Sequence, residues 1–313
     1  MTVFLGVATG CQRGITNGCR DGAEFHDGEV RMSGLGGFRS AGKRARYDAV
    51  YDEALRAMPE PAAVRDPPTA FGAVRVYCFG AGGEPLVLLP GRCGTSVALR
   101  SGIPALARRY RVHTVDPLGE PGRSEQTAPI RDGADQARWL DETLARLGLG
   151  RAHLLGVSSG GWLAANLAVR RPERVASLTL ADSVATFAPV PPGLVVRALP
   201  VRLRYVSSWA RPRFLRWATG ADPADTVEGR LLSAGFQHFR TALPRPVPFT
   251  DEQLRALAMP VLAIIADRSV VHDPRRAYAR ARALLHRGEV ELWPDAAPVE
   301  EVAERTLRFL PAS

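Results

Sequence analysis

The sequence HLLGVSSGGWLAANLAV, residues 153–169, decides the fold of this chain. An apolar run ends at Val157, Ser158 follows, and a helix-forming run begins at Trp162. The pattern predicts a strand, a sharp turn and a helix, with Ser158 at the corner. Strand and helix pass each other closely in such a turn, so the flanking positions must be small. Glycine at positions 156, 160 and 161 meets that requirement.

The serine in this strand-turn-helix context resembles the nucleophile elbow of the α/β-hydrolase family. Two more segments are similar to loops of that family: PGRCG, residues 90–94, and DPLGEPGRS, residues 116–124. The resemblance extends from about Gly37 to Leu310. It implies a bacterial esterase-like hydrolase with a helical insertion over the active site.

Apolar runs of strand length alternate with helical patterns along the chain. This alternation predicts right-handed crossovers and an α/β fold, a mostly parallel, doubly wound sheet of the α/β-hydrolase type with a helical cap insertion. Ligands of such sheets bind beyond the carboxyl ends of the strands. The expected strands are residues 74–79, 85–89, 112–115, 153–157, 176–181, 261–266 and 290–293.

The domain organisation follows from the same pattern. Residues 1–36 lack an apolar face and are expected to be a disordered extension, with Met1 and Met32 both open as the start. Residues 37–186 and 251–313 are expected to form the hydrolase core. The resemblance implies that residues 187–250 form a helical cap. A leader helix is expected from Tyr47 to Met58.

Composition excludes several other classes of protein. The 313 residues are 46% hydrophobic, enough for a large core. The net charge is +9, but the only lysine is Lys43 and the arginines are scattered, so no nucleic-acid partner is expected. The four cysteines form no metal-binding motif, and we expect no metal and no cofactor. No run approaches the ~20 apolar residues of a membrane span, so we expect a cytoplasmic protein without integral membrane association.

The resemblance assigns roles to particular residues. Ser158 would be the nucleophile, and the backbone N–H groups of Ser159 and Arg92 would form the oxyanion hole. Ser269 stands where the family usually has the catalytic acid. Asp182 occupies an alternative position that some members use for the acid, and capping of its own loop is an equally good interpretation.

The catalytic histidine of the family is absent from its usual place. It belongs to the loop after the last strand, and here residues 294–298 contain no histidine and form a short connection, as if a segment had been deleted. His238 and His272 are candidates for a replacement base. His272 follows a strand two places from that of Ser158, or about 10 Å away. His238 is flanked by aromatic residues, which is more typical of a packed core histidine.

Residues 184–220 contain six arginines and no aspartate or glutamate, and aromatic residues alternate with the arginines. Three interpretations remain open at this point. The segment could cover an apolar substrate that carries a carboxylate or phosphate, contact an anionic membrane surface, or expose a solvated arginine face over packed aromatic residues.

Two functions are compatible with the sequence. The first is hydrolysis of a small or medium carboxylic ester or related acyl compound, an apolar small-molecule substrate, through Ser158. The second is a catalytically degenerate member that binds a small apolar ligand or promotes a non-hydrolytic biosynthetic step. A chain damaged by an internal deletion is a third possibility, and such a chain would fold poorly.

Overall fold

The computed structural model describes residues 25–26, 29–30, 34–202, 207–220, 222–295 and 298–311. The chain divides into two units, Met1–Ser33 and Gly34–Ser313. The described part of the first unit is an antiparallel pair, β1 (Phe25–His26) with β2 (Glu29–Val30). Most of the expected N-terminal extension, including Met32, lies outside the described residues.

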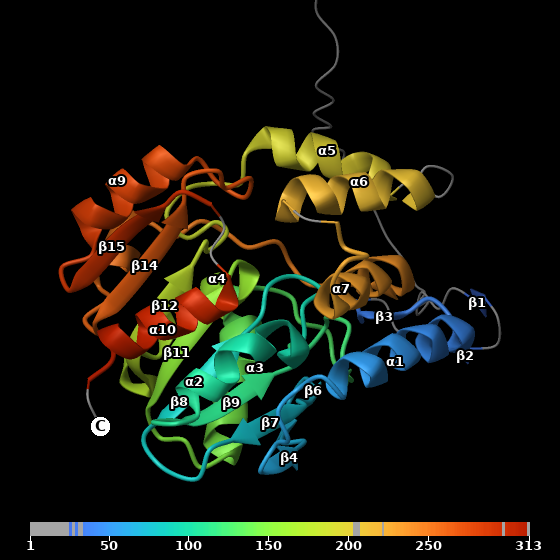
Figure 1. Cartoon of the computed structure of the whole chain (residues 1–313), viewed down its shortest axis with the longest axis horizontal. Coiled ribbons are helices and arrows are strands. Elements are labelled where there is room, and N and C mark those ends of the chain that lie inside the picture. Colours follow the sequence, from blue (N-terminus) through green and yellow to red (C-terminus); the bar gives the residue numbers. More distant parts are fainter. Residues whose placement is uncertain are drawn as a thin grey trace, which may run out of the picture. The chain divides into compact units, whose positions relative to one another are not determined.

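An eight-stranded sheet forms the centre of the second unit (Figure 1). Its strands from β15 to β9 are parallel, and β7 and β4 continue it in antiparallel pairing. The prediction of a mostly parallel α/β sheet is therefore confirmed. The order is β15 (Gly288–Trp293), β14 (Val261–Ala266), β12 (Val175–Ala181), β11 (Ala152–Val157), β8 (Pro85–Leu89), β9 (Arg111–Val115), β7 (Val76–Phe79) and β4 (Ala63–Arg65).

Short strands lie outside this sheet. One antiparallel pair joins β3 (Gly37–Phe38) to β13 (Phe239–Arg240), and a small sheet joins β10 (Glu125–Gln126), β6 (Gly72–Ala73) and β5 (Pro68–Thr69). The β3–β13 pair links a segment near residue 37 to the end of the segment that the sequence predicts as a cap.

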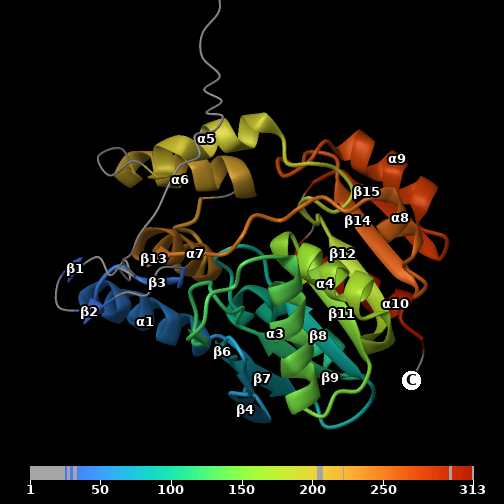
Figure 2. The ribbon, with the colours of Figure 1, turned by 180° about the vertical axis from the view of Figure 1, so that it is seen from behind.

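Helices cover both faces of the central sheet because its strands are apolar on both sides. On β8, Val87 and Leu89 belong to one buried cluster, and Leu86 and Leu88 belong to the other. One face carries α3 (Gly133–Arg146), α4 (Ser159–Arg170) and α9 (Pro274–Leu284), with α3 and α4 in front in Figure 2. The other carries η1 (Ser96–Gly102), α2 (Ile103–Leu106) and α10 (Val299–Phe309). Continuous apolar strands are what a sheet buried on both faces requires.

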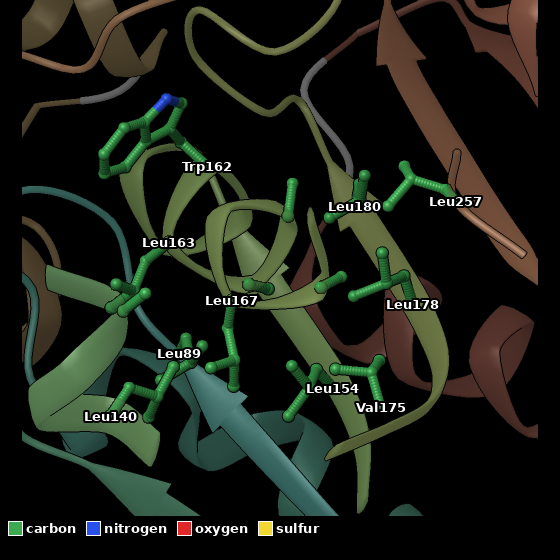
Figure 3. Close-up of a cluster of buried hydrophobic side chains, with 14 of the residues drawn as sticks. Leu89, Leu140, Leu154, Trp162, Leu163, Leu167, Val175, Leu178, Leu180 and Leu257 are labelled. Carbon is green, nitrogen blue, oxygen red and sulfur yellow. The ribbon is translucent and has the colours of Figure 1, made fainter. Parts of the chain in front are cut away.

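The cluster beneath α4 is drawn in Figure 3. Leu163 and Leu167 of α4 lie above Leu89 and Leu154, which come from β8 and β11. All four side chains are buried. This packing fixes α4, and with it the residue at its amino end, against the middle of the sheet.

A third buried cluster joins α1 (Ala41–Leu55) to α7 (Val227–His238), with Tyr47 and Tyr51 packed near Leu231. Helix α1 begins earlier than its apolar pattern predicts. The Ser40 side chain accepts a hydrogen bond from the Lys43 N–H and so caps the amino end of α1. Between β12 and β14 lie α5 (Pro192–Arg202), α6 (Ser207–Thr219), α7 and α8 (Asp251–Arg255).

The turn between β11 and α4 depends on its glycines. A methyl group at Gly160 would lie 2.1 Å from the Leu89 carbonyl oxygen, and one at Gly156 would lie 2.4 Å from the Gly160 carbonyl oxygen. Both contacts are with backbone atoms, which cannot move aside without disrupting strand or helix.

We predict that Gly160→Ala destabilises the protein although the residue lies in a helix. Alanine normally stabilises a helix interior by about 1 kcal/mol relative to glycine. Here the clash with Leu89 should reverse the sign and lower the free energy of unfolding by about 3 kcal/mol. Urea denaturation measures the difference. Gly150→Ala is the control, since no atom within 4 Å meets its added methyl group, and equal stability of the two variants would contradict the prediction.

Candidate active site at the carboxyl edge of the sheet

Ser158 occupies the corner between β11 and α4 in a strained conformation. Its φ is 52° and its ψ is −115°, a region that residues other than glycine rarely adopt. Its N–H donates to the Ala181 carbonyl at 2.9 Å, and its carbonyl accepts from the N–H groups of Trp162 and Val184, each at 3.2 Å. These bonds join the corner to α4 and to the loop after β12. The residue is partly exposed.

The loop after β8 passes directly beside this serine. A methyl group at Gly91 would lie 3.3 Å from the Ser158 Cβ and 3.8 Å from its Oγ. The loop turns tightly, with the Gly94 N–H donating to the Gly91 carbonyl at 2.9 Å. Ser159 is the first residue of α4, where a backbone N–H has no partner within the helix. The residues expected to supply oxyanion donors therefore belong to the two segments that flank the serine.

A buried carboxyl group holds the same loop. Glu120 accepts from the Cys93 N–H at 3.3 Å and lies 3.9 Å from the Arg92 guanidinium. Burial raises the pKa of Glu120 above its usual range, although the positive charge of Arg92 opposes the effect. Because Cys93 donates to Glu120, the N–H of Arg92 stays the candidate donor for substrate. Glu120 belongs to the segment DPLGEPGRS, residues 116–124, and the sequence pattern predicted no role for it.

Asp116, at the carboxyl end of β9, is a second buried acid. Its carboxylate accepts from the Ser96 N–H at 2.8 Å, the Arg123 N–H at 2.9 Å and the Tyr51 hydroxyl at 2.8 Å. It thus ties the loop after β8, its own loop and α1 together. The Tyr51 hydroxyl also lies 3.0 Å from that of Tyr77. The sequence pattern gave no indication that a tyrosine on the leader helix reaches this loop.

Asp182 and His272 are in contact at the same edge. The Nε2 of His272 lies 3.3 Å from one carboxylate oxygen of Asp182, and the other oxygen accepts from the Ser269 hydroxyl at 2.9 Å. The Asp182 carboxylate also accepts from the Ala266 N–H at 3.3 Å. These hydrogen bonds reach across to the loop after β14, so they are not the local capping that sequence offered as an alternative. Ser269, which stands where the resemblance places the family's usual acid, donates its hydroxyl hydrogen bond to Asp182.

The environment of His272 suits a neutral imidazole. The side chain is 2% exposed, and among the described residues neither ring nitrogen makes a well-aligned hydrogen bond. Burial lowers the pKa of His272 below its ordinary value near 6.5, and the Asp182 charge only partly offsets this. A buried imidazole beside a carboxylate can accept a proton that another group releases.

His238, the other candidate base, ends α7 in a cationic environment. Its carbonyl accepts from the Arg39 N–H at 3.0 Å. Burial lowers the pKa of its imidazole, and the positive charges of Lys43, Arg46 and Arg211 lower it further. The causes of that shift include no carboxylate, so of these two candidate bases His272 is the one beside an acid.

A hydrogen-bonded Ser–His–Glu trio occurs at the opposite edge of the sheet. His153 bonds through Nδ1 to Ser177 Oγ and through Nε2 to Glu84, each at 2.8 Å. These residues lie at the amino ends of their strands, and Ser177 is only 3% exposed. The trio resembles a catalytic triad in connectivity but offers no serine hydroxyl to a substrate, so we assign it to packing.

A cavity of about 220 Å³ opens between the loop after β8 and the segment leading into α7. It is lined by Cys93, Gly94, Thr95, Ala98, Asp222, Pro223, Thr226, Glu228, Gly229, Leu231 and Leu232. A larger hollow of about 470 Å³ lies between residues 68–70 and the end of α3. The end of α3 leads to the amino end of β11, away from Ser158, whereas the smaller cavity adjoins the loop after β8. Within the described residues, no group of His, Cys, Asp and Glu could hold a metal ion.

Comparison with known proteins agrees with this fold. The family model described as alpha/beta hydrolase fold matches residues 84–240, half of the chain. Two Bacillus subtilis (strain 168) proteins are similar over 85% of this chain and 93% of their own length: the uncharacterized carboxylesterase nap, 29% identical, and carboxylesterase YbfK, 27% identical. The crystal structure of naproxen esterase (carboxylesterase NP) from Bacillus subtilis superimposes with a TM-score of 0.79, at 27% identity, over 87% of this chain and 99% of that chain. This chain belongs to the alpha/beta hydrolase fold family.

Proposed function

We propose that the protein hydrolyses a carboxylic ester, or a related acyl compound, with Ser158 as the nucleophile. The strained backbone of Ser158, partly exposed at the carboxyl edge beside the Gly91 loop, carries this proposal. Such strain in a non-glycine residue persists where function uses the geometry. The similarity to carboxylesterases over most of the chain supports the same class of substrate.

The N–H groups of Arg92 and Ser159 form the oxyanion hole in this proposal. When the Ser158 Oγ attacks the ester carbonyl, negative charge develops on the carbonyl oxygen. Two fixed N–H donors stabilise that charge without reorganising at the moment of reaction. The alcohol leaves, and a water molecule then releases the acid from the acyl-enzyme.

His272 acts as the general base, and Asp182 orients its imidazole. The imidazole takes the proton of the Ser158 hydroxyl during attack and returns it to the departing alcohol. In this proposal the acid, Asp182, follows β12 and the base, His272, follows β14. Each lies one strand earlier along the chain than the resemblance places it, since the family's usual acid and base would follow β14 and β15. This shift accounts for the absence of a histidine in residues 294–298.

The cavity beside the Gly91 loop accommodates part of the substrate. Its walls come mainly from small or apolar side chains, so a compact apolar acyl or alcohol group fits it. We propose that residues 187–250 act as a helical cap, because α7 supplies one wall of this cavity. Its volume favours a small ester over a long-chain one.

A non-hydrolytic function is the second candidate, favoured by the missing histidine loop. A pocket with oxyanion donors still binds and polarises a carbonyl when proton transfer is slow. In that case the protein would bind an acyl ligand with ordinary affinity and release no alcohol from it.

We predict that Ser158→Ala lowers kcat for a short-chain p-nitrophenyl ester by at least about 10³-fold, because no other group can replace the attacking oxygen. Ser159→Ala is the matched control, since it keeps the backbone N–H that the mechanism uses, and should stay near wild type. Initial rates at saturating substrate measure both. Turnover by Ser158→Ala at the wild-type rate would refute the assignment of Ser158 as the nucleophile. Binding of the ester by the wild-type protein without turnover would favour the non-hydrolytic function.

We predict that His272→Gln and Asp182→Asn each lower kcat by about 10²–10⁴-fold. The base works only when neutral, so wild-type activity should rise with pH through the pKa of His272 and then level off. Because burial lowers that pKa, the rise should lie below pH ~6.5. The pH dependence of kcat/KM measures it.

His238→Gln is the control for this experiment and should keep both the rate and the pH profile. Urea denaturation of each variant checks that it is folded. Loss of activity in His238→Gln together with full activity in His272→Gln would assign the base to α7 and contradict the mechanism.

A further inference from the structure

The outer face of α5 is unusually apolar for an exposed helix surface. Val195, Val196 and Leu199 are 44%, 62% and 53% exposed, three of the six large hydrophobic side chains that the described residues expose. At 100° per residue, the three positions lie on one side of the helix. Pro192 and Gly193 are also exposed on this helix and add no polar side chain.

The opposite side of α5 is the one that packs. Leu194 and Ala198 are half-buried, and α5 contacts α6. The contact with α6 therefore does not account for the apolar residues on the outer face. Figures 1 and 2 show α5 and α6 together at one margin of the second unit, with α5 outermost.

Positive charge borders this face. Arg197, about 100° from Val196 around the helix, is exposed, and its guanidinium is turned toward α6, where it lies 4.6 Å from the ring centroid of Trp217. Residues 184–220 contain six arginines and no acidic residue, and Arg216 pairs with Asp222 just beyond this segment. An exposed apolar patch with a neighbouring arginine suits contact with the interface of an anionic membrane.

We propose that α5 docks the protein on an anionic lipid surface, with Val195, Val196 and Leu199 entering the boundary between headgroups and acyl chains and Arg197 contacting the headgroup phosphates. No helix in the described part of the chain is long and apolar enough to cross a membrane. The contact is thus peripheral and reversible. It brings the segment between β12 and β14, which follows Asp182, next to a source of apolar molecules.

The test is co-sedimentation of the full chain with phosphatidylcholine vesicles that contain, or lack, phosphatidylglycerol. Wild type should bind the anionic vesicles, release from them as salt rises, and bind neutral vesicles poorly. Val196→Asp combined with Leu199→Asp should lower the partition coefficient at least about tenfold, because two apolar contacts are lost and two like charges face the lipid. Arg197→Glu should weaken binding to anionic vesicles.

Val64→Asp is the matched control, since Val64 is an exposed valine on β4, 42% exposed, and should leave vesicle binding unchanged. Thermal unfolding checks that each variant is folded. Equal vesicle binding by wild type and the double variant would overturn the proposal. Equal binding to neutral and anionic vesicles would also overturn it. So would self-association of the wild type in sedimentation velocity that the double variant abolishes, because that result would assign this face to a second copy of the chain.

Discussion

The close approach of α4 to the sheet is the constraint on which the rest of the structure depends. Glycine at positions 156 and 160 lets the helix start within van der Waals contact of β8 and β11. The chain can make this turn only by placing Ser158 at a φ of 52°, which costs on the order of 1–3 kcal/mol. The buried cluster beneath α4 and the bonds to Ala181 and Val184 offset that cost. Packing thus stabilises the partly exposed serine in a conformation it would not adopt alone.

Two buried carboxyl groups hold the loops around the serine in place. Glu120 fixes the loop that follows β8, and Asp116 joins that loop to α1 through Tyr51. Buried acids are costly unless their oxygens are bonded, and the three donors to Asp116 satisfy this condition. Neither acid needs to react. Both fix backbone N–H groups of these loops: Glu120 that of Cys93, and Asp116 those of Ser96 and Arg123.

The sequence was sufficient to predict seven of the eight strands of the central sheet, because most of them are apolar runs followed by a recognisable helix or turn; the edge strand β4 was not expected. The sequence also located the corner at Ser158, where glycine spacing reflects a local steric demand. The ends of the elements were harder to predict. Helix α1 starts at Ala41 because Ser40 caps it, and a capping residue does not show in the spacing of apolar residues. The contact between Asp182 and His272 was beyond reach, because it joins loops 90 residues apart and depends on how β12 and β14 are paired.

The central claim is that Ser158 is a reactive nucleophile despite the missing histidine loop. The most direct measurement is peptide mapping by mass spectrometry after the folded protein reacts with a fluorophosphonate probe. The account predicts a single phosphonate adduct on the peptide containing Ser158, and no adduct after the protein is unfolded before labelling. An unmodified Ser158 in the folded protein, or an adduct on another serine, would contradict it.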